Sequence, residues 1–177
     1  PRSIEVPIEA LCNEDGIRFF ERLGLELPAA IRQRVRRESF RVALSARCLG
    51  KAEQGGTEHV IIEAEAVSTD GALVQRLNAG TWDIVKHDRQ KTEDILLYDR
   101  TNLDAVFSSM ESMRGTFDPD LNAYRSRITK TFAEQFHAWA TPLPEGFELT
   151  TDASLQTILA DPLKATVRFE VQATAMD

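Results

Sequence analysis

The chain is poor in the residues that build metal and redox sites, with two cysteines and three histidines in 177 residues. Cys12 and Cys48 form no C-x-x-C pair, and His59, His87 and His137 show no i,i+2 or i,i+4 spacing. This pattern disfavours zinc, haem and iron–sulfur ligation, so we expect no metal and no cofactor. We interpret both cysteines as buried, reduced, small hydrophobic residues.

The sequence also lacks motifs for membrane insertion and for catalysis. No apolar run approaches the roughly 18 residues that a membrane-spanning helix requires. The N-terminus lacks the basic-then-apolar order of a signal peptide, so we expect a cytoplasmic protein that does not contact a membrane. No G-x-S-x-G elbow occurs, and Gly55–Gly56, the one glycine pair, lies in a hairpin-type turn. We therefore assign no catalytic residue and favour a protein that is not an enzyme.

What the chain does have is the composition of an ordinary globular protein. It is 42% hydrophobic and 28% charged, and its length suits a single domain covering residues 1–177. The formal charge is −7, which disfavours nucleic acid as the main partner because phosphate backbones attract basic surfaces.

Two kinds of hydrophobic period occur, and together they indicate the fold class. Strict alternation predicts strands at 3–10, 39–48, 59–69, 71–85 and 165–175, and a short strand is expected at 95–100 after a charged loop. Helical spacing with capping residues predicts helices at 14–23, 28–37, 101–114, 118–141 and 152–160, the fourth of about 22 residues. Clustered strands indicate an α+β fold, an antiparallel sheet made of a meander plus N- and C-terminal strands. We expect the long helix, as part of an αα-hairpin, to cover this sheet.

One strand shows a change of face. Leu73 and Leu77 occupy odd positions, whereas Trp82 and Ile84 occupy even positions. A regular strand cannot bury both pairs, because successive side chains point to opposite faces. The change therefore predicts a β-bulge between residues 78 and 81.

The distribution of charge gives the strongest indication of a functional surface. Residues 1–50 hold nine arginines against seven acidic residues, whereas the rest of the chain is strongly acidic. On a helix over 28–37, Ile31 and Val35 would face one way and an arginine cluster the other. Two outward arginines of the next strand would extend this surface. The predicted binding residues are Arg32, Arg34, Arg36, Arg37, Arg41 and Arg47.

These observations favour a non-catalytic protein-binding or assembly subunit of a cytoplasmic complex. The arginine-rich helix face would contact an acidic protein partner or a second copy of the chain. An RNA-binding accessory role fits the charge, but no aromatic residues are interleaved with the arginines for base stacking.

Two resemblances give alternative functions. The opening strand, the paired short helices and the long antiparallel strands resemble the start of helix-grip folds, in which a long helix closes a curved sheet. This resemblance implies a small-molecule or lipid ligand. Pro1 before a strand and a helix resembles the tautomerase superfamily, which implies a catalytic N-terminal secondary amine.

Overall fold

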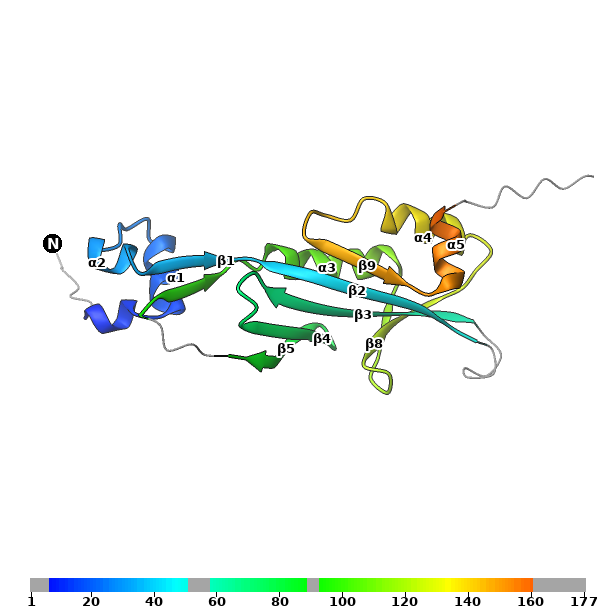
Figure 1. Ribbon diagram of the computed structural model, residues 1–177, viewed down its shortest axis with the longest axis horizontal. Helices are drawn as coiled ribbons and strands as arrows, with labels where there is room; N and C mark the ends of the chain where they lie inside the picture. The colour runs from blue at the N-terminus through cyan, green and yellow to red at the C-terminus, as the bar shows by residue number, and fades with distance from the viewer. Residues whose placement is uncertain (1–6, 51–57, 89–92, 161–177) are drawn as a thin grey trace, which may run out of the picture.

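A curled, mostly antiparallel sheet runs along an elongated molecule and makes the protein α+β, as the sequence predicts (Figure 1). The computed structural model describes residues 7–50, 58–88 and 93–160. Five strands pair in the order β5 (Thr81–His87), β4 (Leu73–Asn78), β3 (His59–Ser68), β2 (Phe40–Leu49) and β9 (Phe147–Thr151). Two further strands, β8 (Ala123–Arg127) and β7 (Thr116–Asp118), continue the sheet from the first half of β3.

Strands β2 and β3 form the centre of the sheet because each alternates apolar and polar side chains. They pair antiparallel over their full length, from Phe40 opposite Ser68 to Leu49 opposite His59. The apolar residues of β2 face a core, whereas Arg41 and its outward neighbours face solvent. The predicted turn after β3 is confirmed by Gly71, whose φ of 72° suits a residue without a side chain.

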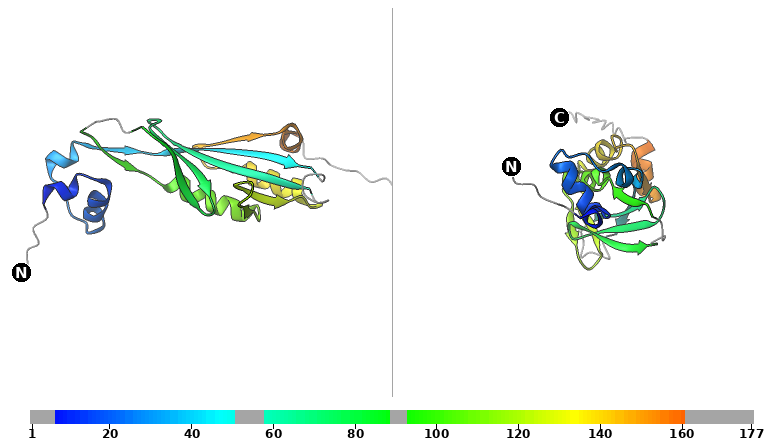
Figure 2. Two further views of the ribbon diagram at one scale, coloured as in Figure 1. Left: turned by 90° about the horizontal axis from the view of Figure 1, so that it is seen from below. Right: turned by 90° about the vertical axis from the view of Figure 1, so that its left-hand side faces the viewer.

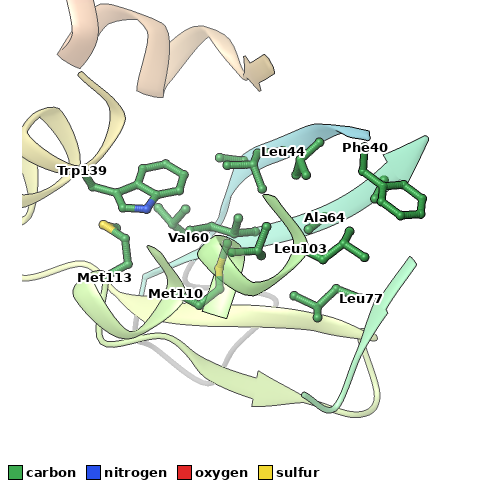
Figure 3. Packing of buried hydrophobic residues seen from close by; sticks show 14 of the residues in the cluster. Phe40, Leu44, Val60, Ala64, Leu77, Leu103, Met110, Met113 and Trp139 are labelled. Atoms are coloured by element: carbon green, nitrogen blue, oxygen red, sulfur yellow. The ribbon is translucent and has the colours of Figure 1, made fainter. Parts of the chain in front are cut away.

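Three helices supply the other wall of the main core: α3 (Thr101–Ser112), α4 (Phe132–Ala140) and α5 (Ala153–Ala160). Figure 2 shows α3 and α4 on one face of the sheet. Figure 3 shows Leu103, Met110 and Met113 packed between α3 and the sheet, with Trp139 at one end of the cluster. Their burial removes large apolar surfaces from water, and this stabilises the sheet's curvature over the helices.

A small lobe lies at one end of the sheet (Figures 1 and 2). It consists of the 3₁₀ helix η1 (Ile8–Leu11), α1 (Glu14–Arg22), α2 (Ala29–Arg32), β1 (Val35–Glu38) and β6 (Ile95–Tyr98). Its own hydrophobic cluster contains Leu11, Ile17, Ile31, Ile95 and Leu97. The predicted cap of α1 is confirmed, because the Asn13 side chain accepts a hydrogen bond from the backbone N–H of Gly16 at 2.8 Å.

The predicted first strand is wrong where the structure describes it. Residues Ile8–Leu11 form a turn of 3₁₀ helix, in which the N–H of Ala10 donates to the carbonyl of Pro7. Only Leu11 of this turn is buried. Alternation over a few residues therefore did not distinguish a strand from a turn that buries one side chain. Residues 3–6 of the predicted strand lie outside the described residues.

The second predicted helix is also wrong beyond its first turn. Helix α2 covers Ala29–Arg32, and Val35–Glu38 is strand β1, paired parallel with β6. Ile31 and Val35 have the i,i+4 spacing of a helix, but the backbone of β1 bonds to β6, a strand some sixty residues away in sequence. That long-range pairing overrides the local period.

The long helix over 118–141 does not form, so there is no αα-hairpin between residues 101 and 141. Strands β7 and β8 occupy its first half, and α4 begins at Phe132. Asp118 starts the hairpin turn by accepting a hydrogen bond from the N–H of Asp120 at 3.1 Å, and Asn122 completes it with a φ of 49°. The Asp-Pro-Asp sequence is thus a turn, a role that it fits as well as it fits a helix start.

The face change near residue 80 comes from a hairpin, so the predicted bulge at 78–81 is wrong. Ala79 and Gly80 have φ values of 47° and 83°, which suit a tight two-residue turn between β4 and β5. Leu77 therefore lies opposite Trp82, on the same face of the sheet. The register shift lies instead at the Val74/Gln75 step of β4.

One strand and the burial of the two cysteines also differ from what the sequence predicts. Strand β9 was not predicted, and it pairs parallel with β2. Cys12 is exposed and Cys48 is half-buried, so neither is the fully buried residue expected. The predicted strand at 165–175 lies outside the described residues.

Candidate functional site

The six predicted arginines do not share a helix face. Arg32 ends α2, and Arg36 and Arg37 are neighbours in β1, so their side chains leave opposite faces of that strand. Arg41 and Arg47 lie on the outward face of β2, in a different part of the molecule. The structure therefore distributes the predicted surface over two strands, a short helix and a turn.

Three of these arginines are engaged inside the small lobe. The Arg34 guanidinium donates to the carbonyl of Glu93 at 2.6 Å. Arg36 lies 3.6 Å from Asp94, and Arg37 pairs with Glu21 of α1. These contacts tie α1 and the start of β6 to β1. The two ion pairs also neutralise the charges of Arg36 and Arg37.

On the outward face of the sheet, the observed ion pair also differs from the ion pairs that the sequence suggests. The sequence suggests cross-strand ion pairs between Arg41 or Arg47 and the glutamates of β3. In the structure Glu65 lies 3.2 Å from Arg76 of β4 instead. The register explains this, because Glu65 lies opposite Ala43 on one side and opposite Arg76 on the other.

Large apolar side chains are exposed mainly on the small lobe. Four of the six exposed large hydrophobic residues of the described chain lie there, although the lobe is the smaller part of the molecule. Phe19 of α1 and Leu23, the C-cap residue that follows it in helical conformation, are 54% and 56% exposed; they are four residues apart and so share one face. Leu25, directly after the helix, is 51% exposed. We call Phe19, Leu23 and Leu25 the α1 patch.

The side chains of the α1 patch do not face the lobe's core, because other residues of α1 already fill that side of the helix. Ile17 is fully buried, and Phe20 packs against the same cluster. These two residues use the face of α1 that contacts the lobe's core. The α1 patch is therefore an additional apolar surface, distinct from the arginine-rich surface that the sequence predicts.

Two arginines of the small lobe have no acidic partner among the described residues. Arg22 lies within the sequence of the patch, and its side chain makes no ion pair or hydrogen bond with the part of the chain that is described. Arg32 donates only to the carbonyl of Leu27, at 3.2 Å. In contrast, Arg18 of the same helix pairs with Glu14. Arginines without an acidic partner, together with exposed apolar side chains, are typical of protein-binding surfaces.

A cavity of about 680 Å³ lies where the small lobe joins the sheet. Tyr98 lines it, and its hydroxyl is buried without a partner among the described residues. Burial raises the pKa of Tyr98, with a further contribution from Asp70 and Glu38, so the phenol stays protonated at neutral pH. Hydrogen bonds from Thr101 lower the pKa of Asp99, which also lines the cavity.

Metal ligands do not gather in the described ranges, where no group of three or more His, Cys, Asp or Glu side chains could hold an ion. Burial raises the pKa of the Cys48 thiol, and nearby Asp152 and Glu58 add to the effect. None of the described helices is long and apolar enough to cross a membrane. Pro1, which carries the tautomerase resemblance, lies outside the described residues.

Comparison of the whole chain with protein-family models, characterised proteins and solved structures finds no match in any of the three. The long helix that carries the helix-grip resemblance is replaced by β7, β8 and α4. A functional proposal for this protein therefore depends on its own geometry.

Proposed function

We propose that the protein is a non-catalytic binding subunit of a cytoplasmic complex and that it docks onto an acidic protein partner through the α1 patch. The observation that carries this proposal is the concentration of exposed Phe19, Leu23 and Leu25 on one small lobe. Large apolar side chains at the centre of a contact supply most of its binding energy when a partner removes them from water.

The charge of the partner follows from Arg22 and Arg32 of the small lobe, which have no acidic partner among the described residues. Arg22 and Arg32 can each form a paired hydrogen bond with a carboxylate, which adds orientation to the apolar contact. The β1 arginines contribute less, because Asp94 and Glu21 already occupy Arg36 and Arg37. The acidic partner of the sequence-based hypothesis is thus retained, but the contact moves from the arginine cluster to α1.

The experiment compares three variants of the full chain in its native cells. The first, Phe19→Gln with Leu23→Gln, removes the apolar surface with a residue that favours helices. The second, Arg22→Glu with Arg32→Glu, reverses the charge beside it. The third, Arg41→Glu with Arg47→Glu, makes the same charge change on the sheet and is the matched control.

Affinity purification with quantitative mass spectrometry reads out the partner, and circular dichroism checks that each variant folds. We expect one acidic protein to copurify in stoichiometric amount with the wild type and the control, and to be at least tenfold depleted with the other two variants. Equal recovery with all variants would refute the α1 patch as the docking surface. Sedimentation analysis adds a separate check: a homodimer that the first variant dissolves would show that a second copy, not an acidic partner, covers the patch.

A further inference from the structure

A second site lies at the other end of the molecule, where α3, β8 and α4 meet. A cavity of about 550 Å³ is lined by side chains from all three elements and the turn before α4. These lining residues are almost entirely polar: Ser112, Arg114, Ser126, Arg127, Thr129, Thr131, Glu134 and Gln135. This volume is within the range of small-molecule sites, roughly 300 to 1,000 Å³.

Buried and inter-element hydrogen bonds hold the three walls together. The hydroxyl of Ser126, which is 4% exposed, donates to the carbonyl of Met113 at 2.7 Å and joins the end of β8 to the end of α3. The Gln135 amide donates to the carbonyl of Ser112 at 3.3 Å and joins α4 to the same point. Arg114 and Arg127 each follow one partner of the first bond, so the fold brings both to the cavity.

The guanidinium groups of Arg114 and Arg127 are free among the described residues. Neither side chain makes an ion pair or a hydrogen bond with the part of the chain that is described, and Glu134 lies beyond ion-pair distance of both. Two arginines and one glutamate give the cavity a local formal charge of +1, in a chain whose net charge is −7. The cavity is thus a positive site on an acidic protein, and it favours an anion.

The backbone around the cavity favours an anion too. The carbonyl groups that end α3 already accept hydrogen bonds: Met110 from Gly115, Glu111 from Arg114, and Ser112 from Gln135. Helix α4 begins beside the cavity, and in its first turn the N–H groups of Phe132 and Gln135 already donate to the carbonyls of Thr129 and Thr131. The N–H groups of Ala133 and Glu134 have no backbone acceptor among the described residues, and such groups at a helix start favour a nearby negative charge.

We propose that this cavity binds a phosphate group, either free or carried by a small alcohol. Arg114 and Arg127 hold the phosphate oxygens by paired, charge-assisted hydrogen bonds, and the Thr129 and Thr131 hydroxyls border the site. Glu134 opposes the bound charge and so limits the affinity. This proposal is independent of the α1 patch, which lies on the small lobe.

The test is a nuclear magnetic resonance titration of the full ¹⁵N-labelled chain with inorganic phosphate and with glycerol phosphate, against sodium chloride of equal ionic strength. We expect saturable shifts of the backbone signals of 114 and 127–135 with both phosphates and none with chloride. A tighter fit for glycerol phosphate assigns a phosphorylated alcohol, and equal affinity assigns free phosphate. Shifts that are linear, or that lie elsewhere, overturn the proposal.

Substitutions of the cavity's charged residues test whether the phosphate binds in this cavity. Arg114→Asn keeps a residue that tolerates the positive φ of 51° at this position, and Arg127→Gln keeps the length of the side chain. Each should weaken binding about tenfold, whereas the matched Arg47→Ala on the sheet should leave it unchanged. Glu134→Gln should tighten binding, since it removes the opposing charge. Equal weakening by Arg47→Ala, or no effect of Glu134→Gln, would place the ion elsewhere and overturn the proposal.

Discussion

Trp139 should be a major contributor from α4 to the main core. Its side chain is 6% exposed, and its ring lies 5.4 Å from that of Phe136. The indole N–H donates to the hydroxyl of Ser109 on α3 at 2.6 Å. Trp139→Ala removes the apolar contact and the hydrogen bond together. We expect a loss of about 3 to 5 kcal/mol, roughly a fifth or more of the stability of an ordinary domain.

Two milder substitutions separate the parts of this loss. Trp139→Phe keeps an aromatic ring but removes the donor, whereas Ser109→Ala leaves the indole N–H without its acceptor. A double-mutant cycle of these two changes should give a coupling energy of about 1 kcal/mol, typical of one hydrogen bond. The two residues belong to different helices, so this coupling measures how firmly α4 is attached to α3.

Urea unfolding followed by circular dichroism measures these losses as changes in midpoint at constant slope. Phe132→Ala, at a residue that is 3% exposed, should cost a similar 3 to 5 kcal/mol. A loss under about 1 kcal/mol for either alanine variant would show that α4 does not cover the core. If Trp139→Ala does not fold at all, Trp139→Phe still gives the measurement.

The small lobe and its junction with the sheet allow three further predictions. Gly16→Ala should unfold the small lobe selectively, with faster hydrogen exchange in α1, because an added Cβ would lie 1.8 Å from the carbonyl oxygen of Ala10. Asp99→Ala should cost about 1 kcal/mol in urea unfolding at pH 7, since its carboxylate accepts two hydrogen bonds from Thr101. The pKa of Asp99 is lowered on folding, so this difference should shrink as the pH falls below the carboxyl's usual pKa and vanish below the lowered pKa of the folded state; a constant difference would contradict this. Tyr98→Phe should leave the unfolding midpoint unchanged or raise it, because the buried hydroxyl has no described partner, and a clear drop would reveal one.

The central strands could be predicted because one local signal decided them. In β2 every second residue from Phe40 to Ala46 is buried, and in β3 the same holds from Val60 to Ser68. Alternation over ten residues fits no helix, so no distant contact was needed to identify these strands. The α1 cap at Asn13 was equally local.

The elements that were wrong had patterns that fit two structures. Leu121, Tyr124 and Ile128 follow a helical stripe, but Tyr124 and Ser126 also alternate as a strand, and pairing of β8 with β3 selects the strand. The parity change after Leu77 fits a bulge within one strand as well as a turn between two. Two factors decide between these structures. One is pairing with a strand that is distant in sequence, and the other is a positive φ at a turn residue, Ala79 or Asn122.

The arginine partners and the α1 patch differ in what a sequence can show. Asp94 pairs with Arg36 across 58 residues of sequence, and Glu21 pairs with Arg37 across 16 residues. No local sequence pattern predicts such pairs. The patch, however, follows from α1 alone. At about 100° per residue, Phe19 and Leu23 lie within roughly 40° of each other and on the side of the helix away from Ile17. Two apolar arcs on one short helix cannot both face the same small core, so the second arc predicts exposure wherever the first one is buried.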